Sequence, residues 1–212
     1  MSQRRVALFG GSFDPPHLGH LHVARAAHEE LALDEVRLLP AAEPPHKRSR
    51  ALAPAADRLA MVTRLAASEP WLAVDSRELA RGGLSYTYDT LVELRRELAP
   101  AVALFFLIGS DSLHDLPTWH RAAELVELAT FVTVPRDRGS LEEAKAAVRA
   151  RLPAAAPRLL AQVLAVAPLP ISSSEVRARC RAGLPVDELV PTGVRDWIAQ
   201  RGLYRGAELR AD

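Results

Sequence analysis

The chain has 212 residues, 49% of them hydrophobic, and its 27 basic and 26 acidic residues leave a formal net charge of +1. This composition allows a sizeable core within one domain and gives no general basic field for nucleic acid or anionic membranes. The single cysteine excludes an intrachain disulfide, and no apolar run reaches the length of a membrane span or a signal-peptide core, so we expect a soluble cytoplasmic protein.

Short apolar runs alternate with amphipathic stretches along most of the chain. Strands are predicted at residues 6–9, 36–40, 71–75, 103–108, 130–134 and 163–167. These runs are mostly continuous, which is typical of strands buried on both faces of a parallel sheet. Helices are predicted at residues 18–31, 55–68, 88–98, 121–128 and 141–151. The alternation predicts right-handed βαβ units and an α/β fold with a doubly wound parallel sheet.

The last part of the chain is predicted to be a small helical part, at about residues 171–204. The stretch "SSSEVRARCRAG" begins with a capping-box pattern, Ser172 and Glu175, and ends at Gly183. "PTGVRDWIAQRG" predicts a final helix, and the polar residues 205–212 a frayed tail. The Pro/Ala stretch at 153–157 predicts a surface loop. Because no repeat or linker divides the sequence, we expect a single domain over residues 1–212.

Four unusual segments follow predicted strands: residues 10–20, 41–50, 109–120 and 168–177. Ligands of open parallel sheets bind outside the carboxyl ends of the strands. We therefore expect these four segments to converge on one crevice.

The stretch "GGSFDPPHLGH" leads from the first predicted strand into the first predicted helix. Gly10 and Gly11 permit a sharp turn and a close approach of the backbone to a ligand. His17 and His20 are three residues apart, so both imidazoles can face an anion at the helix N-terminus. The alternative is a capped turn with surface histidines. Asp14 is expected to bond the loop backbone, with ligand contact as the alternative. The residues of this helix interpreted as structural are His22 and His28.

A second anion signal opens the helix predicted after residue 171. Ser172, Ser173 and Ser174 supply hydroxyl and backbone donors, and Arg177 adds a fixed charge one turn later. A plain helix cap is the alternative interpretation.

Three further loops hold candidate contacts. The basic run "PPHKRSR" is either a solvated charge run or a flap that contacts phosphate. In "IGSDSLHDLPTWHR", Asp111 either orients a ribose or metal or caps a helix, and Trp119 either stacks on a flat ring or makes a hydrophobic contact. In "GGLSYTYDT", a plain N-cap by Thr87 or Ser85 is the default.

The sequence contains no P-loop, G-x-G-x-x-G fingerprint, G-x-S-x-G elbow or zinc-spaced cluster. "GGSFDPPHLGH" together with "ISSSEVR" resembles the two signatures of the nucleotidyltransferase superfamily. "EPPHK", "SYT", "IGSDSLHDLPTWH" and "WIAQRGLY" resemble the bacterial nicotinate-nucleotide adenylyltransferases, over about residues 5–204. The resemblance implies a Rossmann-like nucleotidyltransferase fold.

The resemblance also implies a set of site residues. The catalytic residues it implies are His17, His20 and Arg177. The ATP-binding residues are Gly10, Gly11, Ser12, Phe13, Asp111, Ser172 and Ser173. The mononucleotide-binding residues are His46, Lys47, Tyr86, Thr87, Trp119 and Arg136. Departures from the pattern are mild: Ser174 replaces the usual threonine, Ser12 stands where threonine is frequent, and His120 stands where tyrosine is common.

The implied reaction transfers the adenylyl group of ATP to nicotinate mononucleotide in NAD biosynthesis. Mg²⁺ is expected to arrive with ATP, without a metal site of the protein's own. No nucleic-acid or membrane partner is expected, and the oligomeric state stays open. The alternatives are adenylyl transfer to nicotinamide mononucleotide or another phosphorylated acceptor, and a non-catalytic nucleotide-binding regulator on the same fold.

Overall fold

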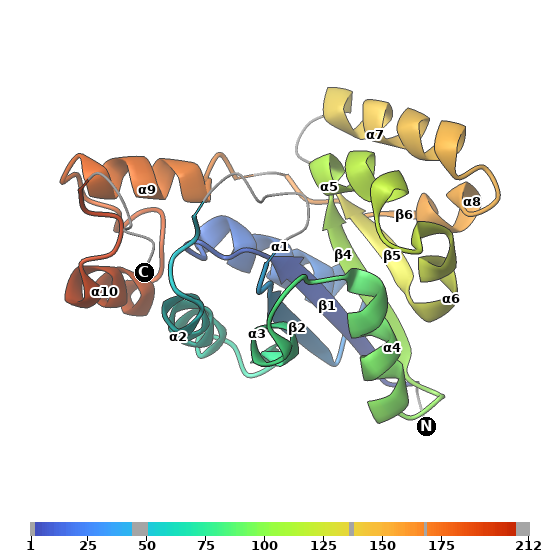
Figure 1. Ribbon diagram of the computed structural model, residues 1–212, viewed down its shortest axis with the longest axis horizontal. Helices are drawn as coiled ribbons and strands as arrows, with labels where there is room; N and C mark the ends of the chain where they lie inside the picture. The colour runs from blue at the N-terminus through green and yellow to red at the C-terminus, as the bar shows by residue number, and fades with distance from the viewer. Residues whose placement is uncertain (1–2, 44–50, 136–137, 168, 207–212) are drawn as a thin grey trace.

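The computed structural model of the protein describes residues 3–43, 51–135, 138–167 and 169–206. In these ranges the chain forms a parallel sheet between two layers of helices (Figure 1). The strands are β1 (Arg5–Gly11), β2 (Glu35–Pro40), β3 (Leu72–Val74), β4 (Ala103–Gly109), β5 (Thr130–Val134) and β6 (Gln162–Val163). The α-helices are α1 (Leu18–Glu30), α2 (Ala55–Ala66), α3 (Arg77–Arg81), α4 (Thr87–Glu97), α5 (Ser110–Asp115), α6 (Leu125–Leu128), α7 (Arg138–Arg151), α8 (Ala156–Leu159), α9 (Ser173–Arg181) and α10 (Thr192–Arg201). Two 3₁₀ turns, η1 (Leu116–Thr118) and η2 (Ala122–Glu124), complete the elements.

The strand order is β3-β2-β1-β4-β5-β6, and each neighbouring pair is parallel. This is the order of a doubly wound sheet, in which the chain reverses its direction of travel between β1 and β4. The predicted fold class is confirmed. Ligands of such sheets bind where the strand order reverses, so a ligand site is expected at the carboxyl ends of β1 and β4.

The central strands are apolar along their whole length because both faces of the sheet are buried. In β1, Val6 and Leu8 face one core cluster and Ala7 faces the other. Phe105 of β4 packs with Ala7, whereas Phe106 packs with Leu8. Helices α1, α2, α9 and α10 cover the face that carries Ala7, and α4 to α8 cover the face that carries Val6 and Leu8.

The C-terminal helix α10 lies beside α2 (Figure 1). Val176 of α9 and Val194 of α10 belong to the same core cluster as the sheet residue Ala7. Asp57 of α2 is 3% exposed and accepts hydrogen bonds from Trp197 Nε1 (3.2 Å) and Arg201 Nε (3.0 Å). These contacts hold the C-terminal part against the sheet layer.

Several predicted elements differ in extent. The strand predicted at 163–167 is reduced to Gln162–Val163, because Val166 N–H bonds back to Leu164 O (3.0 Å) and turns the chain away from β5. The helix predicted at 121–128 begins with Arg121 in the left-handed conformation and becomes η2 followed by α6. The expected surface loop at 153–157 includes buried Ala155 and the first residues of α8. The frayed tail predicted beyond Tyr204 falls mostly outside the described residues.

None of the helices that the structure describes is both long and apolar enough to cross a membrane.

Candidate active site

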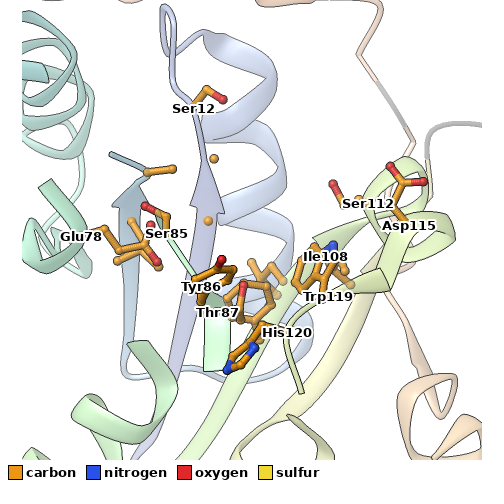
Figure 2. A pocket seen from close by; sticks show the side chains of 17 residues that line it. Ser12, Glu78, Ser85, Tyr86, Thr87, Ile108, Ser112, Asp115, Trp119 and His120 are labelled. Carbon is orange, nitrogen blue, oxygen red and sulfur yellow. The ribbon is translucent and has the colours of Figure 1, made fainter. Parts of the chain in front are cut away.

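A cavity of about 190 Å³ opens at the carboxyl ends of β1, β2 and β4, where the strand order reverses (Figure 2). Three of the four predicted segments, those after β1, β2 and β4, contribute residues to its wall. Six of the predicted site residues line it: Gly10, Gly11, Ser12, Tyr86, Thr87 and Trp119.

One side of the cavity is aromatic. Trp119 packs edge-on against Phe106 of β4, with ring centroids 6.4 Å apart and planes at 86°. Tyr86 lies at the opposite end of this wall, with its ring 5.0 Å from that of His120. Trp119 and Tyr86 both line the cavity and both belong to the described residues predicted to hold a mononucleotide. The cavity therefore has the flat apolar surfaces that a pyridine ring needs.

The N-cap predicted in "SYT" is wrong. Tyr86 occupies the N-cap position of α4, and no side chain caps this helix end. The Ser85 hydroxyl instead accepts a hydrogen bond from Ala42 N–H (2.9 Å), which ties this segment to the loop after β2. Thr87 is the first residue of α4, so the first turn of the helix meets the cavity.

The His-x-Gly-His turn lies next to the cavity at the start of α1. His17 is the N-cap residue, and its N–H donates to His20 Nδ1 (3.1 Å). A neutral His20 must then carry its hydrogen on Nε2, which makes that atom a donor. The two imidazole rings lie 3.7 Å apart. A Cβ atom on Gly19 would come within 3.0 Å of the His17 ring, so glycine at this position leaves room for the imidazole.

Helix α9 begins directly against this turn. Ser173 Oγ donates to Pro15 O (2.8 Å), and Arg177 Nη1 donates to Asp14 O (2.5 Å). Ser172, the N-cap residue of α9, accepts from Glu175 N–H (3.1 Å), as the capping-box pattern predicted. Two segments 158 residues apart in sequence thus form one site, with two helix N-termini and a buried guanidinium side by side.

The buried carboxylate of Asp14 stabilises the turn through hydrogen bonds to other parts of the chain. Its Oδ1 accepts from Ala53 N–H (3.1 Å), in the backbone just before α2, and from the Tyr204 hydroxyl (2.7 Å). Burial and the nearby Asp14 carboxylate both raise the pKa of the Tyr204 phenol. The hydroxyl therefore stays protonated and remains a donor to Asp14.

Replacing Tyr204 with phenylalanine removes a hydrogen bond to a buried charged acceptor. We expect the free energy of unfolding, measured by urea denaturation at pH 7, to fall by about 1.5–3 kcal/mol. The pKa of an unfolded tyrosine is about 10, so the raised pKa makes the wild type lose stability as pH rises above about 10, and Tyr204→Phe removes that part of the loss. An unchanged free energy of unfolding at pH 7 would contradict this role of the hydroxyl.

Arg58 of α2 and Glu78 of α3 are site residues that the sequence analysis missed. Arg58 is 2% exposed and donates to Ser12 O (3.0 Å) and Ala41 O (2.6 Å), which links the loops after β1 and β2. Burial lowers the pKa of its guanidinium, and the Asp14 charge partly restores it.

The sequence contains a signal for the burial of Arg58, since Arg58 shares a helical face with the buried Met61 and Leu65. Glu78 lines the cavity from a five-residue helix, which is too short for a periodic pattern.

The remaining predicted residues lie as follows. The Phe13 side chain is in the core, 2% exposed, so any ligand contact there belongs to its main chain. Asp111 is exposed in the first turn of α5. His22 Nε2 bonds Ala167 O (2.9 Å), and His28 stacks on Trp71 with centroids 4.2 Å apart, so both are structural as predicted. The predicted residues outside the described ranges are His46, Lys47 and Arg136.

Comparison with known proteins identifies the family. Residues 8–179 match the cytidylyltransferase-like family model. The chain is 47% identical over 212 residues to a probable nicotinate-nucleotide adenylyltransferase from Laribacter hongkongensis, covering 94% of both chains. It is 42% identical over 204 residues to the protein of the same name from Thermomicrobium roseum, covering 96% of this chain and 93% of the relative.

A solved structure agrees in fold. The nicotinic acid mononucleotide adenylyltransferase of Plasmodium falciparum, complexed with NaAD, superposes with a TM-score of 0.70 over 95% of this chain and 97% of that one. At 20% sequence identity this likeness shows the fold alone. The matching family model and the two near-full-length relatives, taken with this fold, show that the chain belongs to the nicotinate-nucleotide adenylyltransferases of the cytidylyltransferase-like family.

Proposed function

We propose that the protein transfers the adenylyl group of ATP to nicotinate mononucleotide, forming nicotinate adenine dinucleotide (deamido-NAD) and pyrophosphate, in cytoplasmic NAD biosynthesis. The observation that carries the proposal is the adjacency of two sites. The aromatic-walled cavity and the anion-binding turn share the loop after β1, because Ser12 lines the cavity and Asp14 bonds Arg177 of α9. The two substrates can therefore meet at this loop, and the shared core of sheet and C-terminal helices favours one domain.

The chemistry requires positioning more than proton transfer. The attacking group is a phosphate monoester with a second pKa of about 6, so it is mostly a dianion at neutral pH. No general base is needed. The obstacle is to bring one anion up to another and to let pyrophosphate leave, which calls for fixed positive electrostatics.

The residues around the turn supply those electrostatics. His17 and His20 act as donors to the ATP phosphates and the transition state, with His20 using Nε2 because Nδ1 already accepts from His17 N–H. The start of α9 and Arg177 hold the leaving pyrophosphate. ATP enters as its Mg²⁺ complex, so the metal belongs to the substrate, and its contacts are mostly to phosphate and water.

The cavity takes the mononucleotide. Trp119 stacks on the pyridine ring, and the backbone donors at the first turn of α4, near Tyr86 and Thr87, receive its carboxylate. The assignment of His46, Lys47 and Arg136 to mononucleotide binding rests on the resemblance alone. The resemblance is also the sole basis for assigning five residues to ATP binding: Gly10, Gly11, Phe13, Asp111 and Ser172.

A panel of acceptors tests the proposal. Pyrophosphate release is measured with ATP and Mg²⁺ in the presence of nicotinate mononucleotide, nicotinamide mononucleotide or phosphopantetheine. We expect the highest kcat/KM with nicotinate mononucleotide. A higher kcat/KM with another acceptor would show that this acceptor is the preferred substrate. ATP binding without pyrophosphate release for any acceptor would indicate a non-catalytic regulator.

A further inference from the structure

Glu78 is a buried carboxyl group in the wall of the cavity that the proposed reaction leaves without a role. It is 4% exposed and, in Figure 2, lies beside Ser85 and across the cavity from Trp119. Burial raises the pKa of its carboxyl group, while hydrogen bonds from Thr90 and Ser85 act in the opposite direction. Burying such a group is costly unless its hydrogen bonds are satisfied, so its partners show what it holds.

The directions of these hydrogen bonds follow from the donors around them. Arg81 Nη2 donates to Thr90 Oγ1 (2.9 Å), and Thr90 Oγ1 donates to Glu78 Oε1 (2.7 Å). Ala42 N–H donates to Ser85 Oγ (2.9 Å), and the Ser85 side chain lies beside Glu78 at the cavity wall (Figure 2), where it helps to lower the pKa of the carboxyl group. An ionised carboxylate has no hydrogen, so a hydroxyl that bonds it must donate. The bonds from Thr90 and Ser85 both lower the pKa of Glu78, so both stabilise its charged form, and Glu78 is the acceptor of each.

The two hydroxyls lead to different parts of the molecule. Thr90 is fully buried within α4 and does not line the cavity. Ser85 lines the cavity and directly precedes Tyr86 and Thr87. Its N–H also donates to Glu43 O (3.0 Å), so Ser85 joins the start of α4 to the loop after β2 at both its backbone and its side chain.

We infer that Glu78 is a positioning residue for the mononucleotide, acting through the Ser85 hydroxyl to fix the segment from Ser85 to Thr87 at the cavity wall. The inference rests on the proposed function, because that segment is where the pyridine carboxylate is received. Glu78 does not touch the reacting phosphates, so its loss affects mononucleotide binding rather than the chemical step.

Three variants test this inference, each assayed by pyrophosphate release with both substrates varied. Glu78→Gln removes the negative charge and replaces one acceptor oxygen with an NH₂ donor, so the two hydroxyls share a single, uncharged acceptor oxygen. We expect KM for nicotinate mononucleotide to rise about 10-fold, and kcat and KM for ATP to stay within about two-fold. Ser85→Ala should reproduce this pattern. Thr90→Val is the matched control: it breaks the other hydrogen bond to Glu78, so it should lower the thermal midpoint and leave KM for the mononucleotide unchanged.

The outcomes separate the inference from the proposed function. If the wild type releases no pyrophosphate with nicotinate mononucleotide, the proposed function fails. If the wild type is active and Glu78→Gln leaves KM for the mononucleotide unchanged, the inference alone fails. It also fails if Thr90→Val raises this KM as much as Glu78→Gln does, or if both KM values and kcat change together. Should Glu78→Gln not fold, Ser85→Ala with an unchanged KM for the mononucleotide overturns the inference.

Discussion

Replacing His20 with alanine is expected to lower kcat by roughly 10²–10³-fold, the range for losing one preorganised transition-state donor. His20 Nδ1 is occupied by His17 N–H at 3.1 Å, which leaves Nε2 as the donor of a neutral ring. The ring is half-buried against Phe13, with centroids 4.9 Å apart, so its orientation is set before substrate binds. Steady-state kinetics with saturating ATP and mononucleotide measure the effect.

Two further variants separate the donor from the local fold. His20→Asn places an acceptor near the position of Nδ1, so it can keep the bond to His17 N–H while losing the reach of Nε2. We expect its kcat to fall nearly as far as that of His20→Ala. His28→Ala, at the other end of the same helix, removes only the stacking on Trp71 and should leave kcat unchanged. A His20→Ala enzyme with near-wild-type turnover would remove His20 from the mechanism.

Replacing Trp119 with alanine is expected to raise KM for the mononucleotide by roughly 10- to 100-fold, since stacking of a base on an aromatic ring contributes about 1–3 kcal/mol. Trp119 lines the cavity and is fixed edge-on against Phe106. KM for ATP should change little, because His17, His20 and the start of α9 are not among the residues that line this cavity. Kinetics with each substrate varied in turn make the comparison.

Trp119→Phe is the control for this prediction. A phenyl ring keeps an aromatic surface at the same place, so the rise in KM should be smaller than with alanine. Circular dichroism should show that both variants keep their secondary structure. An effect confined to KM for ATP would show that the cavity had been assigned to the wrong substrate.

The sequence predicted the fold well where the signal is local. The continuous apolar runs of β1 and β4 were recognisable because both faces of these strands are buried. The run at 163–167 is also apolar, yet Val163 is its only residue in the ladder with β5, since a bond from Val166 N–H to Leu164 O turns the chain. Arg121 adopts a φ of 54°, in the left-handed region. Non-glycine residues adopt this conformation rarely, so the sequence gives no indication of it.

The candidate site divides in the same way. The His-x-Gly-His turn and the serine-rich start of α9 were predictable because each places its donors within a few consecutive residues. The roles of Arg58 and Glu78 were not, since they come from contacts between distant segments; the sequence indicates only that Arg58 lies on the buried face of its helix. Arg58 joins Ser12 to Ala41, and Glu78 acts through Ser85 on Ala42. Such residues become visible only when the loops after neighbouring strands are placed side by side.

The adjacency of the histidine turn and α9 has a direct mechanistic consequence. Arg177 is 8% exposed, and its bonds to Asp14 O and Ser174 Oγ fix its guanidinium beside the turn before any substrate arrives. A preorganised cation requires no reorganisation when charge develops on the leaving group. For the proposed reaction, we therefore attribute the rate enhancement to prepositioned donors at the histidine turn and at the start of α9.

A crystal structure with nicotinate mononucleotide and a non-hydrolysable ATP analogue tests this account most directly. The account predicts that the β- and γ-phosphates lie between the imidazoles of His17 and His20 and the start of α9. It also predicts that an oxygen of the mononucleotide phosphate lies about 3–3.5 Å from the α-phosphorus. A triphosphate bound away from both helix starts, or a pyridine ring outside the cavity lined by Trp119, would contradict it.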